Sequence, residues 1–462
     1  MNRNKGIYVA LLSGFSTVFG LTVAPTNPLI VLLSVILLPL ITTYIFTRNL
    51  SISLIIIWLN ELIFGMSGAW LKIGFLPGRG LLLLFIISTF LLNRKFRQSL
   101  QEISPKTHKI IIFYSIVFPG LLFFWGVLYN GAEISNALSD ILRFFGLLGF
   151  YPLYYLFSRY FPFIKAWILT AVLLLSSVFI FAHISSDEIR ILIVDNWVYL
   201  GRDMDKKINY IRLSYESILY GFIGLFYGLL LIYNKSSKSK TISILLVIVN
   251  LLPIILNFLR GPILSIFISA MLFIAGQAKS TKQLIPLIKT APAILMVFII
   301  GSYFLLQNPL AENKLIELQS SSTLEDYVKE ARVIQTKAML DAWIEAPFLG
   351  KGVGIPLEGY YRGSGLSAEV QYAMVLYRTG IVGLFIVTLP FFFLAYRIIS
   401  YRIKINNKLH SSVTILELSI ALTLLSLGIA SFFNPYLASS VTITLFIMYL
   451  AAKETEKLSR KY

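Results

Sequence analysis

Residues 307–379 read QNPLAENKLIELQSSSTLEDYVKEARVIQTKAMLDAWIEAPFLGKGVGIPLEGYYRGSGLSAEVQYAMVLYRT, and they are the one long break in a nearly continuous series of apolar segments. The stretch combines an amphipathic segment, a cluster of glycines and many charges. An apolar chain with one large polar interruption is typical of a set of membrane spans that carries one large loop. We therefore look for the reactive face of the protein in and around this loop.

The composition supports a membrane fold. The 462 residues are 57% hydrophobic and only 13% charged, with a mean hydropathy of +0.79, whereas a soluble domain carries about 25% charged residues. Runs such as Leu81–Leu92 and Ile242–Leu256 lack the alternation of a transmembrane barrel strand. The predicted fold class is all-α: a polytopic helical membrane protein with about fourteen transmembrane helices of about 20 residues, in a single membrane domain over 1–462.

The apolar runs also predict where the spans lie. We interpret the first run, which follows Arg3 and Lys5, as an uncleaved span rather than a cleaved signal peptide. Basic residues gather in alternate loops, and the positive-inside rule assigns those loops and both termini to the cytoplasm. The loops at 67–79, 130–140, 184–212 and 307–375 then face outward. The spans are expected near 7–24, 28–46, 51–67, 80–92, 110–129, 141–157, 164–183, 213–233, 241–257, 261–275, 290–306, 376–396, 412–432 and 436–452.

Charge and residue usage exclude several classes of function. The net charge of +18 would suggest nucleic acid for a soluble protein, but here the basic residues orient spans, so no nucleic-acid partner is expected. The chain has no cysteine, which excludes disulfides, thiolate metal sites and cysteine nucleophiles. Its three histidines, His108, His183 and His410, are too few for a histidine-rich metal centre. We expect neither a metal nor a cofactor.

The long loop, 307–375, is predicted to contain an amphipathic helix over 323–346. A capping-box pattern begins at Ser322 and Pro347 ends the helix. We expect this helix to lie on the outer membrane surface. Gly350, Gly352 and Gly354 follow, and we interpret them as a hinge rather than a phosphate loop, because no strand precedes them and no GK[ST] follows. The apolar stripe of the helix is Tyr327, Ala331, Ile334, Ala338 and Ala342.

Four arginines and one glutamate are the candidate site residues. Arg212, Arg260, Arg332 and Arg378 lie at the outer face or in the outer leaflet, where an arginine either binds a phosphate group bidentately or extends its charge to the membrane interface. Glu369 lies where the long loop re-enters the membrane. A partly dry carboxylate can act as a general base, and the alternative is a carboxylate that stabilises a helix start.

Two further acids have a structural explanation beside the functional one. Glu61 lies inside a span, where an acid is a functional candidate, but an ion pair with Lys72 or Arg79 is an equal alternative. Asp140 and Arg143 are three residues apart on one predicted helix, and we interpret them as a local ion pair.

The candidate residues lie in a series of short motifs. They are Arg212-Leu213-Ser214, Leu259-Arg260-Gly261-Pro262, Arg332 to Trp343, Pro347-Phe348-Leu349-Gly350-Lys351-Gly352-Val353-Gly354, Glu369-Val370-Gln371-Tyr372 and Gly380-Ile381-Val382-Gly383-Leu384. Each motif is degenerate, but in their order and spacing they resemble the O-antigen polymerase and O-antigen ligase superfamily over roughly 205–450. Ligases of that superfamily usually have a histidine followed by asparagine where this chain has Glu369 and Val370, so the resemblance favours the polymerase.

The resemblance implies a polysaccharide polymerase in the inner membrane of a bacterium that needs neither metal nor nucleotide. A growing glycan on undecaprenyl pyrophosphate would be the donor and a lipid-linked repeat unit the acceptor. Glu369 would be the catalytic base, and Arg212, Arg260, Arg332 and Arg378 would bind the pyrophosphate. The expected partners are these undecaprenyl-pyrophosphate-linked oligosaccharides and the lipid bilayer, and a chain-length regulator protein is a further candidate partner.

Two other functions stay open on the sequence. A flippase for lipid-linked oligosaccharides would have the same composition and number of spans, but it would not need so large an outer loop and would show internal half-repeats. An O-antigen ligase is the second alternative, and Glu369 in place of the histidine argues against it.

Overall fold

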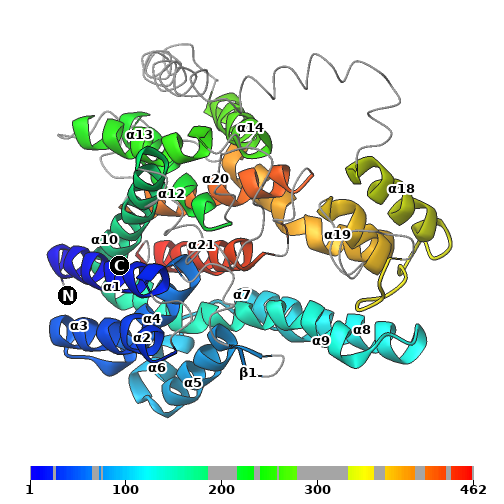
Figure 1. The fold of residues 1–462 in the computed structure, drawn as a ribbon, viewed down its shortest axis with the longest axis horizontal. Coiled ribbons are helices and arrows are strands. Elements are labelled where there is room, and N and C mark those ends of the chain that lie inside the picture. Colours follow the sequence, from blue (N-terminus) through cyan, green and yellow to red (C-terminus); the bar gives the residue numbers. More distant parts are fainter. Residues whose placement is uncertain are drawn as a thin grey trace.

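The computed structural model describes residues 2–23, 28–64, 72–73, 76–185, 216–233, 240–256, 260–277, 331–357, 370–400, 412–432, 437 and 439–459. Within these ranges the chain is helical, which confirms the helical fold class (Figure 1). One small hairpin was not expected. Its strands, β1 (Lys72–Ile73) and β2 (Leu76–Pro77), pair antiparallel.

The helices are interrupted in places by π-helical turns, η1 to η3, and by 3₁₀ turns, η4 and η6. In chain order the elements are α1 (Arg3–Val23), α2 (Pro28–Val31), η1 (Leu32–Leu37), α3 (Leu38–Thr47), α4 (Leu50–Phe64), α5 (Gly78–Leu92), α6 (Arg94–Leu100), α7 (Pro105–Ile112), η2 (Phe113–Val117), α8 (Phe118–Phe124), η3 (Trp125–Tyr129), α9 (Ile134–Ile141), η4 (Leu142–Gly149), α10 (Phe150–Ile184), η6 (Glu216–Tyr220), α12 (Gly221–Tyr233), α13 (Lys240–Leu256), α14 (Arg260–Gln277), α18 (Ala331–Ile344), α19 (Gln371–Ser400), α20 (Ser412–Ala430) and α21 (Ser440–Ser459).

Six helices in the described part of the chain are long and apolar enough to cross a membrane: Arg3–Thr22, Leu29–Thr47, Pro105–Tyr129, Ile134–Ala182, Gln371–Ser400 and Ser412–Ala430. Shorter apolar helices of 10–17 residues accompany them. The number of fourteen spans stays a prediction, because the expected span at 290–306 lies outside the described residues. The expected spans at 141–157 and 164–183 form one continuous helical stretch, with a kink at Tyr160 (φ −134°, ψ 35°).

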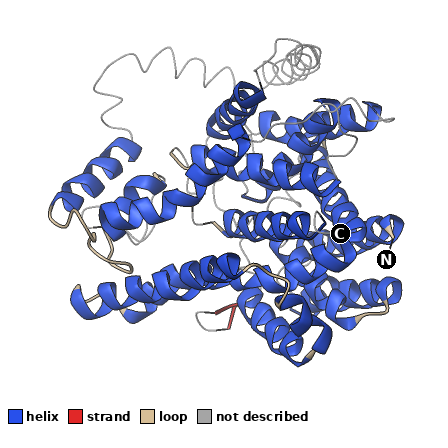
Figure 2. Cartoon of the chain, turned by 180° about the vertical axis from the view of Figure 1, so that it is seen from behind, coloured by secondary structure: helices blue, strands red, loops and turns tan. Residues whose placement is uncertain are grey.

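The main bundle is built around α20. In its most apolar window 94% of the residues are buried, because α12, α14, α19 and α21 pack around it. Apart from Glu417, the helix carries apolar and small side chains on every side, the pattern of a fully enclosed helix. The remaining helices of the bundle, which include α1, α4 and α10, extend the same apolar core (Figures 1 and 2).

Small residues let one buried amide into this core. The Asn250 side chain on α13 accepts a hydrogen bond from Ser176 Oγ at 2.8 Å and donates one to the carbonyl of Leu246 at 2.7 Å. A Cβ at Gly224 of α12 would lie only 2.4 Å from the Asn250 amide nitrogen. Glycine therefore allows α12 and α13 to approach closely around a satisfied polar group, as in other membrane helix pairs.

Two groups of helices extend from one side of the bundle (Figures 1 and 2). One is the stretch from α7 to η3 followed by α9, and the other is α19 with α18 against its first turns. Only 17% of the residues in the most apolar window of α19 are buried, and Ile381, Phe385, Phe392, Phe393 and Tyr396 are exposed. The hydroxyl of Tyr114 donates to the carbonyl of Ile386 at 2.8 Å and so joins the two groups.

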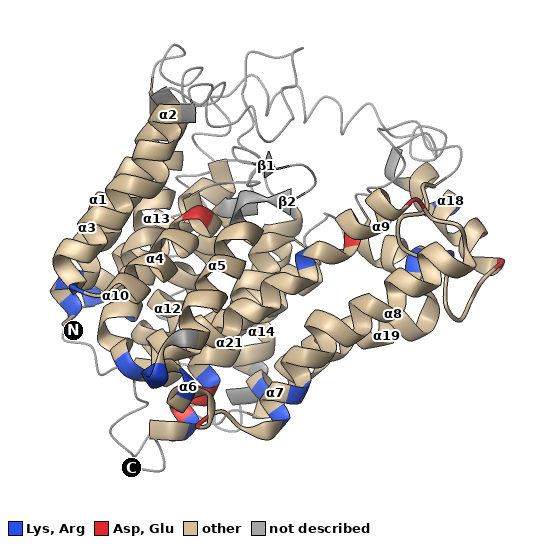
Figure 3. Cartoon of the chain, turned by 90° about the horizontal axis from the view of Figure 1, so that it is seen from below, with Lys and Arg blue, Asp and Glu red and all other residues tan. Residues whose placement is uncertain are grey.

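Lysines and arginines are distributed unevenly over the bundle. They gather around the start of α1, around α6 and at the start of α7, and a smaller group lies by α9 and α18 (Figure 3). Helix starts at this basic end are capped: Asn93 accepts from the backbone of Lys95 at 3.0 Å, and Ser104 precedes Pro105 at the first position of α7.

Candidate functional site

The candidate site forms around a break in α19. Gly380 has φ 62° and ψ −168°, a conformation that only glycine adopts without strain. A helix cannot continue through such a residue. The carbonyls of Tyr377 and Arg378 before the break, and the amides of Ile381 and Val382 after it, therefore lose their helical partners.

The segment Pro347–Gly352 supplies new partners for this backbone. It runs alongside the break as a neighbouring strand would in a sheet. Two of its amides donate hydrogen bonds to α19, and two of its carbonyls accept hydrogen bonds from α19. A span that is opened in this way needs such partners, because the membrane interior offers no water to the freed groups. The bonds run from Lys351 N to Tyr377 O (2.8 Å), from Gly352 N to Arg378 O (2.9 Å), from Ile381 N to Pro347 O (3.0 Å) and from Val382 N to Phe348 O (3.2 Å).

The predicted glycine hinge is wrong for Gly350, Gly352 and Gly354. All three have positive φ, 68°, 97° and 79°, but they are held tightly rather than loosely. A Cβ at Gly350 would lie 2.5 Å from the α19 backbone, one at Gly352 would lie 2.8 Å from Gly126 Cα, and one at Gly354 would lie 2.6 Å from the backbone nitrogen of Ala137. The glycines therefore allow the backbone of residues 350–354 to lie directly against the backbones of α19, η3 and α9. Three further glycines of the long loop, Gly359, Gly363 and Gly365, lie outside the described residues.

Residues 353–357, which follow the segment Pro347–Gly352, are held in place by apolar contacts on both sides. Val353 packs with Ala137 and Ile141 of α9, and Leu357 packs with Met339 of α18 and Tyr377 of α19. Ile355 contacts both clusters. In addition, the indole nitrogen of Trp125 donates to the carbonyl of Gly350 at 3.2 Å. Residues 347–357 therefore join the α9 region to the α18–α19 pair.

A helix is present within the range of the predicted surface helix, and its place on a membrane surface stays a prediction. Helix α18 covers 331–344 of the expected 323–346, residues 323–330 lie outside the described part, and Pro347 follows the last turn. Its packed face differs by one position from the predicted stripe, because Ile334 is 50% exposed whereas Gln335 and Met339 are buried. This face packs against the first turns of α19, whereas the prediction placed it against a membrane surface.

Asp140 and Arg378 form an ion pair at the break. Arg378 Nη1 lies 2.7 Å from Asp140 Oδ2, and the two side chains are only 12% and 10% exposed. The same carboxylate oxygen accepts the Gly354 amide at 2.9 Å. Breaking a buried pair from one side costs roughly 3–5 kcal/mol, since the other charge remains buried. The expected ion pair between Asp140 and Arg143 is replaced by one with a residue far along the chain.

The structure locates the other predicted site residues only in part. Arg260 is the first residue of α14, which packs against α19 and α20, and Arg332 is the second residue of α18. Their side chains, like the whole of Arg212 and Glu369, lie outside the described part of the chain. Arg378 is thus the one predicted site residue whose contacts are described. Asp140 was missed, because its sequence neighbourhood offers Arg143 as a sufficient partner.

No known family model matches this chain, and none of the curated proteins matches it. Among the described residues, no group of three or more histidine, aspartate or glutamate side chains is arranged to hold a metal ion. Glu61, the intramembrane acid, is buried in α4. Its proposed partners, Lys72 and Arg79, have side chains outside the described part.

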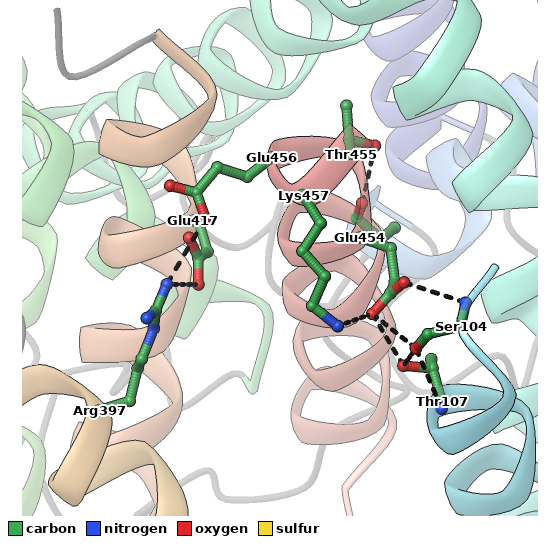
Figure 4. Close-up of polar contacts among 9 residues, drawn as sticks. Ser104, Thr107, Arg397, Glu417, Glu454, Thr455, Glu456 and Lys457 are labelled. Atoms are coloured by element: carbon green, nitrogen blue, oxygen red, sulfur yellow. Dashed lines mark hydrogen bonds and ion pairs between the residues drawn. The ribbon is translucent and has the colours of Figure 1, made fainter. Parts of the chain in front are cut away.

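A second polar network closes the opposite end of α19, around Arg397 (Figure 4). Arg397 Nη2 lies 3.4 Å from Glu417 of α20 and 3.5 Å from Glu456 of α21. Both carboxylates are buried, and Thr414 donates to Glu456 at 3.0 Å. One arginine therefore ties three helices together at this end.

Glu454, on the neighbouring face of α21, fastens the start of α7 to the bundle (Figure 4). It accepts hydrogen bonds from Lys457, from the Thr107 hydroxyl at 2.8 Å and from the Ser104 amide at 3.2 Å. Burial disfavours its charge, but these bonds and the Lys457 charge outweigh burial, so the pKa of Glu454 lies below the usual 4.5. This network includes residues of the basic end and is structural in character.

Replacement of Gly380 by alanine is expected to destabilise the site. The new Cβ would lie 2.2 Å from the carbonyl oxygen of Phe348, in a conformation that costs roughly 1–3 kcal/mol for a non-glycine residue. We expect a lower melting temperature in detergent and faster hydrogen exchange at the amides of Ile381 and Val382. Gly131→Ala is the matched control, because Gly131 also has positive φ (69°) but has no atom within 4 Å of a new Cβ. Equal exchange in both variants would contradict the prediction.

Glu454→Gln should lose stability in a pH-dependent way. Because the pKa of Glu454 is lowered by folding, its contribution is complete above the unfolded value of 4.5 and disappears as pH falls through the lower folded value. The variant should be roughly 1–3 kcal/mol less stable than wild type near pH 7, and the gap should close in acid. Thermal unfolding of both proteins in detergent, near pH 7 and in acid below the folded pKa of Glu454, measures this difference in stability. Glu345→Gln, at a carboxylate that is 69% exposed, should show no such gap.

Proposed function

We propose that this chain is a polysaccharide repeat-unit polymerase that works at the outer face of a bacterial inner membrane. The observation that carries the proposal is the pairing at the α19 break. Two sequence blocks that carry the resemblance, Pro347–Gly354 and Gly380–Leu384, are joined there by backbone hydrogen bonds, next to Arg378. Separate motifs that come together around a buried arginine support a site for an anionic substrate.

The charge distribution supports the orientation. The network of Arg397, Glu454 and the start of α7 lies with the basic end, which the positive-inside rule assigns to the cytoplasm together with both termini. From Gly380 to Arg397 a helix rises roughly 25 Å, close to the hydrocarbon thickness of about 30 Å. The break and Arg378 then belong to the opposite, extracytoplasmic side, where lipid-linked sugars are polymerised.

In the proposed reaction Glu369 takes the proton of the acceptor hydroxyl as that oxygen attacks the anomeric carbon of the donor glycan. A new glycosidic C–O bond forms, the C–O bond to the pyrophosphate breaks, and undecaprenyl pyrophosphate leaves. Arg212, Arg260, Arg332 and Arg378 stabilise the charge that develops on the pyrophosphate. A positioned cation of this kind supplies about 3–4 kcal/mol, and a positioned base contributes about 10²–10⁴-fold.

A flippase for lipid-linked oligosaccharides is the second candidate, and the broken α19 favours it. Discontinuous spans are common in transporters, where they form the substrate site. The two functions differ in their product. Purified protein in vesicles with a lipid-linked repeat unit yields a ladder of longer glycans if it is a polymerase, and only transferred, unextended lipid if it is a flippase.

Glu369→Gln is expected to abolish most of the ladder in this assay. The amide keeps the size of the side chain but cannot accept the proton, so the rate should fall about 10²–10⁴-fold. The measurement is the initial rate of repeat-unit addition on a gel. Glu345→Gln, an exposed carboxylate on the same loop, serves as control. An intact ladder from Glu369→Gln would show that this residue is not the base.

Arg260→Lys tests whether this arginine binds phosphate through two nitrogens. Lysine keeps the positive charge but offers a point charge in place of a planar fork. We expect at least a tenfold loss in kcat/KM, mainly through a raised KM for the pyrophosphate-linked donor. Full activity in the lysine variant would leave bidentate binding at Arg260 without support.

A further inference from the structure

One carboxylate oxygen connects three elements at the α19 break. Asp140 Oδ2 lies 2.7 Å from Arg378 Nη1 and accepts the Gly354 amide at 2.9 Å. Asp140 belongs to α9, Arg378 to α19, and Gly354 to the segment that fills the break. Because both charged side chains are almost fully buried, this oxygen determines how the guanidinium group lies against the 350–354 backbone.

Asp140 can hold these groups in place because it is itself held in place. Ala137, one turn before Asp140, and Ile141, directly after it, pack against Val353, and all three are buried. The Gly354 backbone lies so close to α9 that a Cβ on Gly354 would come within 2.6 Å of the backbone nitrogen of Ala137. A charged group fixed on a rigid helix positions its partner more accurately than one on a loop.

The local charges favour an anion. Arg143, one turn beyond Asp140 and exposed, lies close enough to act on the charge of Arg378. Among the described side chains, two guanidinium groups and one carboxylate leave a net charge of about +1 here; the buried Arg378 and Asp140 act strongly on each other, whereas solvent screens the exposed Arg143. Asp140 therefore has two opposed effects: its negative charge repels an anion, and its hydrogen bonds arrange the arginine that attracts one.

We propose that the second effect dominates, and that Asp140 is a positioning residue that orients Arg378 toward a pyrophosphate group. The inference rests on the proposed function for the identity of the ligand as a polyprenyl pyrophosphate. It assigns to Asp140 no contact with the reacting atoms. Its effect is transmitted through Arg378, so a loss of Asp140 should matter only while Arg378 is present.

Binding of farnesyl pyrophosphate to the purified protein, followed by calorimetry, tests this inference without requiring turnover. Asp140→Asn keeps the size of the side chain and an oxygen for the Gly354 amide but loses the charge, and it should bind about 10- to 100-fold more weakly. Asp140→Glu should recover part of the affinity. Arg378→Gln should bind weakly too, and the double variant should bind no worse than Arg378→Gln alone. Farnesol, which lacks the pyrophosphate, should bind all variants equally.

The matched control is Glu133→Gln, the same change of charge at an exposed position just before α9, where the carboxylate accepts hydrogen bonds from Ser135 and Asn136. It should bind as wild type does. Tighter binding by Asp140→Asn would show that simple repulsion dominates and would overturn the inference, as would additive losses in the double variant or no binding by wild type. Wild-type binding that depends on Asp140, without a ladder in the polymerisation assay, would overturn the proposed polymerase and leave the inference standing.

Discussion

The break in α19 at Gly380 sets the requirement that the surrounding structure meets. A span that opens inside a membrane leaves carbonyls and amides that water cannot reach, and each such group costs several kcal/mol unless protein supplies a partner. Here the partner is the segment Pro347–Gly352, which makes four backbone hydrogen bonds across the break. The positive-φ glycines and the close contact with α9 follow from that need, because only a backbone without side chains can approach so closely.

The two ends of α19 make different kinds of contact. At one end Arg397 joins Glu417 and Glu456 while Glu454 holds the start of α7, so that α7, α19, α20 and α21 are tied together at the basic end. At the other end the helix is broken at Gly380, is buried around Tyr377 and Thr379, and is joined to α9 through Asp140 and Arg378. This arrangement suits the proposed polymerase, because the tail of its lipid-linked substrate would stay in the bilayer and the head group would lie at the surface.

Several features could be predicted from the sequence because their causes are local. Apolar runs identified helices such as Ser412–Ala430, and the end of α18 at Ile344 follows from Pro347 three residues later. The same local view produced the errors. Three glycines in five residues indicate flexibility when nothing is known of their surroundings, and Arg143 is an adequate partner for Asp140 when only one helix is considered. Ile334 was placed on the packed face of α18, but the partner helix α19 meets the neighbouring face.

The sequence by itself determined that the chain forms apolar helices, where several of them begin and end, and that many basic residues gather at one end, because hydropathy, capping and charge act within a few residues. Tertiary structure alone decided that α19 breaks at Gly380, that residues 347–354 repair the break and that Asp140 pairs with Arg378. These outcomes depend on groups that are distant in the chain and adjacent in space. In a bilayer the satisfaction of a freed backbone group is a strong constraint, and only the packed helices show which segment provides it.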